Sequence, residues 1–186
     1  SYGEFRIENV GQEVELYGWV QKKRDLGGLV FIDLRDRSGV IQLVSRPEDS
    51  FYDVATSLKN ESVIRAVGTI KERESKNLNI PTGEVEVETT NLELLGKTED
   101  IPFEIVDDTT ALEDTRLKYR YLDLRRNAIK DRLILRSKVC SVIRNYLNNQ
   151  SFIELETPIL CKSTPEGARD FLVPSRMSKG SFYATT

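Results

Sequence analysis

The chain has 186 residues, of which 39% are hydrophobic and 31% charged, with a formal net charge of −3, two Cys and no His. Without His, the chain holds no Ser-His-Asp triad, Cys-His dyad or His-bearing zinc site, and we expect no metal site. The two cysteines, Cys140 and Cys161, do not suggest a disulfide framework, and no apolar run approaches the ~20 residues of a membrane-spanning helix. We therefore expect a cytoplasmic protein that makes no membrane contact.

The first half of the chain predicts a small β-barrel. Its five candidate strands are rich in β-branched and aromatic residues and are separated by Gly- and Pro-containing turns. Apolar residues at helical spacing between the third and fourth strands predict one helix over 47–60. Five strands with a helix in this place are typical of the OB-fold, a five-stranded barrel. The predicted strands cover 13–24, 29–36, 40–44, 62–73 and 84–95.

The second half has a different charge and a different period. Residues 1–100 carry a net charge of −6, whereas 101–186 carry +3. Residues 107–127 predict a linker with a helical turn or two, and an apolar stripe predicts a helix over 128–149. FIELETPIL, residues 152–160, predicts a strand that ends at Pro158, and the remainder predicts a long loop with one more short strand. Such a set of elements needs further strands to pack against, so we expect exposed apolar surface on the helix.

Two residues of the candidate barrel point to nucleic-acid binding. Phe31 alternates with apolar residues and shares its face with charged side chains, which suits a stacking platform for an unpaired base. Gln42 alternates in the same way with the apolar residues Ile41 and Leu43, and its amide can both donate to and accept from a base edge. The alternative is that Phe31 covers a barrel edge or packs beneath a loop.

Charged residues near these two extend the same hypothesis. Lys22, Lys23 and Arg24 end the first strand beside them, although such a run is also typical of a solvated strand end. Glu84, Glu86 and Glu88 alternate along the fifth strand, where a carboxylate can accept from base amino groups. Charge that protects an edge strand explains the same pattern. The acidity of this half favours recognition of a few bases over binding of any sequence.

Four segments of the chain resemble the bacterial type of aspartyl-tRNA synthetase, a class II aminoacyl-tRNA synthetase, in order and spacing. The resemblance spans about residues 2–183. It implies an OB-fold anticodon-binding domain over 1–102, a hinge over 103–127, and the first helix and strand of the class II catalytic domain over 128–186. The segments are GWVQKKRDLGGLVFIDLRDRSGVIQLV, RLKYRYLDLRR, FIELETPIL and STPEGARDFLVPSR.

The resemblance also implies roles for individual residues. Phe31 matches the aromatic that stacks on the middle anticodon base, and Gln42 and Arg24 match residues that bind anticodon bases. Asn77 and Glu86 match positions near the first anticodon base. In the second half, Glu166 matches a glutamate that holds the ammonium group of substrate aspartate. FIELETPIL resembles class II motif 1, in which Pro158 lies at a homodimer interface.

After Ala184 the chain departs from the family pattern, because the arginine-bearing motifs that hold ATP and magnesium do not follow. The resemblance implies that the full-length enzyme uses ATP and Mg to join aspartate to its tRNA. We expect this chain alone to carry no catalytic residue, to bind neither cofactor and to be inactive. Two alternatives stay open: a stand-alone OB-fold nucleic-acid-binding module without catalysis, and a sibling synthetase for asparagine.

Overall fold

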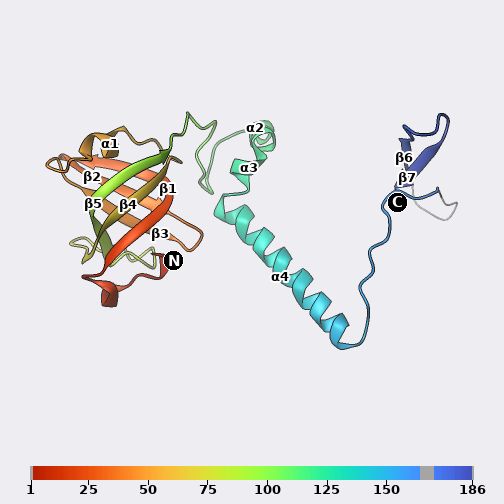
Figure 1. The fold of residues 1–186 in the computed structure, drawn as a ribbon, viewed down its shortest axis with the longest axis horizontal. Helices are drawn as coiled ribbons and strands as arrows, with labels where there is room; N and C mark the ends of the chain where they lie inside the picture. The colour runs from red at the N-terminus through yellow and green to blue at the C-terminus, as the bar shows by residue number, and fades with distance from the viewer. Residues whose placement is uncertain (1, 164–169, 186) are drawn as a thin grey trace. The chain divides into compact units, whose positions relative to one another are not determined.

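The computed structural model describes residues 2–163 and 170–185. The chain divides into two compact units, Ser1–Glu104 and Ile105–Thr186. The first unit is a closed five-stranded barrel (Figure 1), and the second holds three helices and a two-stranded sheet among its described residues.

The barrel has the strand order β1-β2-β3-β5-β4, and β4 returns to pair with β1. All neighbouring strands are antiparallel except β3 and β5, which run parallel. One short helix, α1, lies between β3 and β4, as the sequence predicts for an OB-fold. Two 3-10 turns precede the barrel, η1 (Tyr2–Glu4) and η2 (Ile7–Asn9). The barrel elements are β1 (Glu13–Leu26), β2 (Leu29–Arg35), β3 (Val40–Ser45), α1 (Tyr52–Ser57), β4 (Val63–Glu72) and β5 (Val85–Gly96).

Alternation along the strands separates a hydrophobic core from an outer face. On β2, Val30, Ile32 and Leu34 are fully buried inside the barrel, while Phe31 and Asp33 between them are half-buried on the other face. Each fully buried aliphatic side chain contributes about 1.5–3 kcal/mol relative to an exposed one. A slip of one residue in strand pairing would move the apolar side chains out of the core, so burial fixes the register of each strand. The register in turn determines which side chains share the outer face.

Gly68 allows β4 and β5 to approach closely. A Cβ built at this position would lie 2.3 Å from the carbonyl oxygen of Glu88. The β4–β5 register shifts between Val67 and Gly68, which is the pattern of a β-bulge. The extra residue of the bulge is Thr90 on β5, so β5 bends at this point, as closure of a small barrel requires.

The helix α1 is shorter than the predicted helix over 47–60. The Asp49 side chain accepts a hydrogen bond from the Arg46 amide at 2.7 Å, and the Asp49 amide donates to the Arg46 carbonyl at 3.0 Å. This side-chain bond closes a turn in competition with a helix, so the first helical residue is Tyr52.

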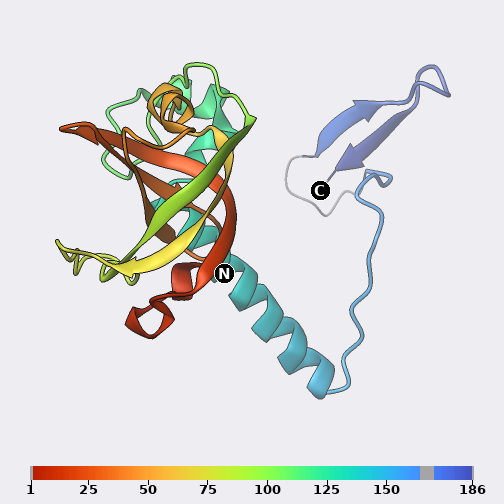
Figure 2. The same cartoon turned by 60° about the vertical axis from the view of Figure 1, so that its left-hand side comes forward.

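The second unit begins with a helical segment in the predicted linker region. Its helices are α2 (Glu113–Lys118), α3 (Arg120–Asp123) and the long α4 (Asn127–Asn149). The strands β6 (Phe171–Pro174) and β7 (Phe182–Thr185) form an antiparallel pair (Figure 2). The sequence predicted one short strand in this last part, and the structure has two.

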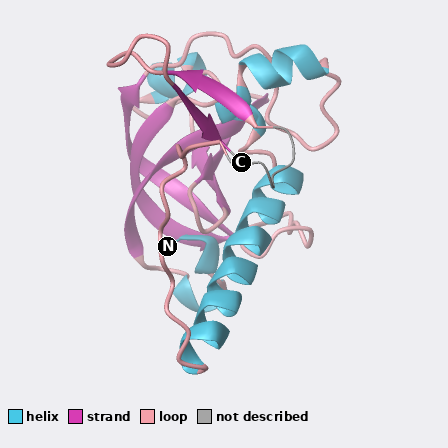
Figure 3. Cartoon of the chain, turned by 90° about the vertical axis from the view of Figure 1, so that its right-hand side faces the viewer, coloured by secondary structure: helices cyan, strands magenta, loops and turns pink. Residues whose placement is uncertain are grey.

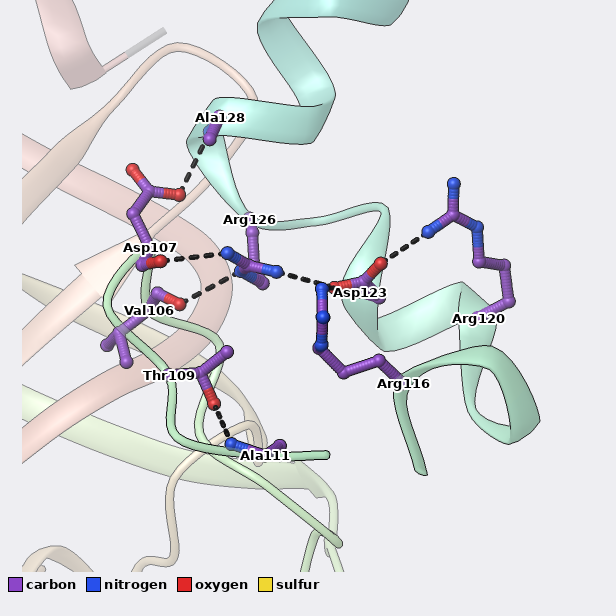
Figure 4. A network of polar contacts seen from close by, with 9 residues as sticks. All are labelled: Val106, Asp107, Thr109, Ala111, Arg116, Arg120, Asp123, Arg126 and Ala128. Atoms are coloured by element: carbon purple, nitrogen blue, oxygen red, sulfur yellow. Dashed lines mark hydrogen bonds and ion pairs between the residues drawn. The ribbon is translucent and has the colours of Figure 1, made fainter. Parts of the chain in front are cut away.

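An ion-pair network around Asp123 orders the predicted linker (Figure 4). The Asp123 carboxylate is 1% exposed and accepts a hydrogen bond from Arg126 Nη1 at 2.8 Å; Arg120 Nη1 also donates to it. Arg126 in turn donates to the backbone carbonyls of Val106 and Asp107 at 3.0 and 2.8 Å. The segment is therefore fixed by buried charge, which a search for periodic apolar residues does not detect.

The long helix α4 (Figure 3) carries many exposed large apolar side chains. Leu135, Val142 and Tyr146 are each more than 60% exposed. This agrees with the surface predicted for this helix. Among the described residues, no helix is both long and apolar enough to cross a membrane.

The strand predicted over 152–160 is absent. Residues 152–160 form an irregular, exposed segment, in which Ile153 is 83% exposed and Ile159 is 81% exposed. A strand needs a neighbour for its backbone hydrogen bonds, and none of the described residues provides one here. The apolar pattern of FIELETPIL is therefore not sufficient to form a strand in this chain.

Candidate nucleic-acid interface

Cross-strand register aligns two ranks of residues on the outer face of the barrel. Phe31 on β2 lies opposite Arg24 on β1 and Val44 on β3. In the neighbouring rank, Gln42 on β3 lies between Asp33 on β2 and Glu86 on β5. Because alternate side chains of a strand share a face, both ranks point to the same side of the sheet.

Residues of both ranks line a cavity of about 340 Å³. Cavities of this size accommodate small ligands or single groups of larger ones. Four of the five residues predicted to bind anticodon bases line it, and Asn77 does not. The lining residues are Arg24, Leu26, Leu29, Phe31, Gln42, Val44, Arg46, Arg73, Glu74, Ser75 and Glu86.

Gln42 lies at the centre of a hydrogen-bond network in this cavity. Its Oε1 accepts from Arg24 Nη2 at 3.1 Å and from Arg73 Nη2 at 3.0 Å. Its Nε2 donates to Glu86 Oε2 at 2.7 Å. These three bonds set the orientation of the amide, with the carbonyl toward the guanidinium groups and one N–H still able to donate to a ligand.

Gln42 is only 4% exposed, although the sequence pattern places it on the wetter face of β3. The reason is the network itself, because the long side chains of Arg24, Arg73 and Glu86 converge on the amide. Gln42 therefore forms part of the cavity floor, and a ligand that reaches it must also contact the surrounding charged groups.

Burial shifts the pKa values of the two carboxylates beside Gln42, Glu86 and Asp33. Burial raises the pKa of Glu86 above its ordinary value, although the Gln42 hydrogen bond and the charge of Arg73 act to lower it. Burial likewise raises the pKa of Asp33, against the opposing charges of Arg24, Arg73 and Lys22. The charged forms of both groups are thus held at an energetic cost, which is common at binding sites.

Two donors of the cavity arginines have no acceptor among the described residues. The Nε atoms of Arg24 and Arg73 are buried and make no hydrogen bond. A buried donor without a partner is unfavourable by about 1–3 kcal/mol. Each of these two arginines therefore holds one donor whose hydrogen-bonding capacity is unused inside the network.

Phe31 supplies aromatic surface beside these polar groups. The ring is half-buried and lines the cavity together with Leu29 and Val44. A planar base can stack on such a ring while its edge meets the amide and guanidinium groups. The combination of one aromatic face and a ring of donors and acceptors is what recognition of an unpaired base requires.

Asn77 lies in the loop between β4 and β5 and shapes that loop. Its side-chain Oδ1 accepts from the Asn79 amide at 3.1 Å, and its backbone amide donates to the Gly83 carbonyl at 2.9 Å. At Gly83 the backbone approaches so closely that an added Cβ would lie 1.7 Å from the Asn77 carbonyl oxygen. The role of Asn77 near a base stays a prediction.

Sequence reasoning missed two cations of the cavity, Arg73 and Arg46. Arg73 follows β4, and Arg46 follows β3 and pairs with Glu88 at 3.3 Å. Their local sequence carries little signal, because charged residues at strand ends are usually solvated. The β2–β3 pairing brings Arg46 near Phe31, whereas Arg73 reaches the cavity only through the nonlocal pairings of β5 with β3 and β4.

The two predicted site residues of the second unit do not form a described site. Glu166 lies outside the described residues, so the structure does not bear on its predicted role. Pro158 is exposed. A mainly apolar cavity of about 330 Å³ lies nearby between α4 and residues 152–154, and Pro158 does not line it.

Family models match both halves of the chain. Residues 14–95 match the OB-fold nucleic acid binding domain, and residues 112–186 match the tRNA synthetases of class II (D, K and N). Among solved structures, the asparaginyl-tRNA synthetase of Pyrococcus horikoshii covers 96% of this chain and 40% of its own, with a TM-score of 0.80 and 24% identity. The aspartyl-tRNA synthetase of Entamoeba histolytica covers 82% of this chain and 38% of its own, with a TM-score of 0.75 and 22% identity. At such identity these two likenesses concern the fold alone.

The fold and the cavity thus define an OB-fold nucleic-acid-binding domain, joined to part of a class II tRNA synthetase domain. Two relatives are much closer in sequence: the aspartate–tRNA ligase 2 of Streptococcus mutans and the aspartate–tRNA ligase of Streptococcus suis, each 56% identical over 98% of this chain. This chain is thus homologous to these aspartate–tRNA ligases over nearly its whole length. It spans about a third of the length of these relatives, 31% and 32% respectively.

Proposed function

We propose that the barrel binds the anticodon loop of an aspartate-type tRNA through the cavity around Phe31 and Gln42. One observation carries this proposal: an aromatic ring and a fixed amide line the same cavity, surrounded by charged groups from β1, β5 and the segments that follow β3 and β4. Phe31 stacks on the middle anticodon base, while Gln42 and Arg24 contact base edges. Glu86 and Asn77 serve the first anticodon base.

The complete protein, in this proposal, activates aspartate with ATP and transfers it to its tRNA in the cytoplasm. This chain supplies recognition and the beginning of the catalytic domain, with a hinge over 103–127 between them. Among the described residues, no three potential ligands of the His, Cys, Asp or Glu type gather as a metal site. In this proposal ATP and Mg bind to the part of the relatives that this chain does not span, and the chain alone is inactive.

Two further roles in the second unit belong to the same proposal. Glu166 holds the ammonium group of aspartate in the complete enzyme. The apolar face of α4 and the segment around Pro158 meet a second subunit there, and this explains why so many large apolar side chains of α4 are exposed in this chain.

The test is a fluorescence anisotropy titration of this chain with an RNA stem-loop that carries the anticodon GUC. A matched stem-loop has the middle U replaced by C. Tighter binding to the first, lowered by Gln42→Ala, supports the anticodon role. Equal binding to both stem-loops by a folded chain contradicts it and favours a nucleic-acid-binding module without base recognition.

A further inference from the structure

Asp33 contacts the cavity network from outside the cavity lining. Its Oδ1 accepts from Arg24 Nη2 at 2.6 Å, and the same nitrogen donates to Gln42 Oε1 at 3.1 Å. The Asp33 side chain is 24% exposed and that of Arg24 is 37% exposed. Asp33 is not among the residues that line the cavity, whereas Arg24 and Gln42 are.

This geometry fixes a side chain that would otherwise be mobile. An arginine has many rotamers, and a short charge-assisted bond holds its guanidinium in one plane. With Arg24 held by Asp33, one guanidinium nitrogen is directed at the Gln42 carbonyl. Together with the Arg73 and Glu86 bonds, this determines which way the Gln42 amide faces a ligand.

A carboxylate at this place is unfavourable unless it has such a role. It is partly desolvated, and burial raises its pKa despite the neighbouring charge of Arg24. It also repels the phosphates of any RNA bound nearby. Because the side chain of its partner Arg24 is 37% exposed, the ion pair by itself contributes little to the stability of the barrel.

We propose that Asp33 is a positioning residue for base recognition: through Arg24, it holds the Gln42 amide in the orientation that reads the middle base. This inference rests on the proposed anticodon function. It assigns Asp33 no contact with the RNA.

The proposal and simple electrostatics predict opposite signs for Asp33→Asn. Loss of a negative charge beside an anionic ligand strengthens binding if charge alone matters. If Asp33 positions Arg24, the same change weakens binding and lowers the preference for U over C. Asp53→Asn is the matched control, because Asp53 is exposed on α1, lies outside the cavity lining and carries the same charge.

The experiment measures Kd values of the full 186-residue chain for the two stem-loops, before and after Asp33→Asn. We expect about fivefold weaker binding to the GUC stem-loop, on the scale of a base-reading contact, and a smaller U/C ratio. In an Arg24→Gln background, Asp33→Asn changes either Kd by less than about twofold, because the residue through which it acts is gone. Asp53→Asn leaves the ratio unchanged.

A second variant keeps the test valid if Asp33→Asn does not fold. Asp33→Glu preserves the charge but moves the carboxylate by one methylene, so we expect it to lower the U/C ratio too. Unchanged or tighter binding by the folded variants, or the same loss with and without Arg24, overturns the positioning role. If the unmodified chain itself does not distinguish the stem-loops, the proposed function fails, and this inference fails with it.

Discussion

Replacing Phe31 by Ala removes the aromatic surface of the cavity and leaves Arg24, Gln42 and Glu86 in place. A base stacked on an aromatic side chain contributes about 1–3 kcal/mol. Because the Phe31 ring is already half-buried by its neighbours, we take the lower part of this range. A loss of about 1–2 kcal/mol corresponds to a roughly 5- to 30-fold higher Kd for the GUC stem-loop.

The variant should remain folded. Phe31 points away from the barrel core, so its truncation costs less than the ~3–5 kcal/mol of a core Phe→Ala change. Circular dichroism and thermal unfolding check this. Tyr17→Ala is the matched control, since Tyr17 is an aromatic of the same barrel, 53% exposed and outside the cavity lining.

The assay separates stacking from base reading. Every base has a π-face, so Phe31→Ala should weaken binding to the U and C stem-loops by similar factors and leave their ratio nearly unchanged. Gln42→Ala should instead bring the two Kd values together. If folded Phe31→Ala binds within twofold of the unmodified chain, or if it alone abolishes the U/C ratio, the assignment of the ring as a stacking platform is wrong.

Three further predictions follow from charged residues. Arg46→Gln should weaken binding to both stem-loops equally and reduce the slope of log K against log[salt] by about 0.7–1, as loss of one phosphate contact does. Arg37→Gln, at the opposite end of the β2–β3 hairpin, is the control and should change neither quantity. Because the folded-state pKa of Glu86 is raised, barrel stability should fall as pH rises through that pKa; Glu86→Gln should raise the urea midpoint at pH 7 and lose this advantage in acid. For Asp123, burial acts to raise the pKa, but the hydrogen bond and charge of Arg126 and its neighbours outweigh burial and lower it. Its contribution to stability is therefore present above the ordinary Asp pKa and lost as pH falls through the lowered one. The hydrogen-exchange protection factors of residues 113–128, which correct for the slower intrinsic exchange in acid, should therefore fall with pH, and Asp123→Asn should remove this dependence.

The barrel was predictable because its information is local. Alternation on β2 separates Val30 and Ile32 from Phe31 and Asp33, and turn residues punctuate the strands. The fold class also agrees with the family models. The prediction of a strand over 152–160 was wrong, because an apolar pattern forms a strand only beside a partner strand, and the described residues provide none here.

The candidate site was only partly accessible from the sequence. Phe31 and Gln42 stand out by alternation, but their neighbours depend on pairings between distant strands. Arg73 reaches Gln42 across 31 positions of sequence and Glu86 reaches it across 44. The sequence analysis missed the Asp123 network for another reason: ion pairs hold this network together, and its residues show no periodic apolar pattern.

The parallel pairing of β3 with β5 has a consequence for synthesis of the protein. β5 is the last strand of the barrel, and it joins both β3 and β4. Until about Gly96 has left the ribosome, the nascent chain exposes the unpaired edges of both strands to other chains. Slow translation just before β5 would lengthen the interval in which those edges can aggregate. Once β5 docks, its pairing with β3 and β4 removes both edges, and Glu86 comes within reach of Gln42 in the same event.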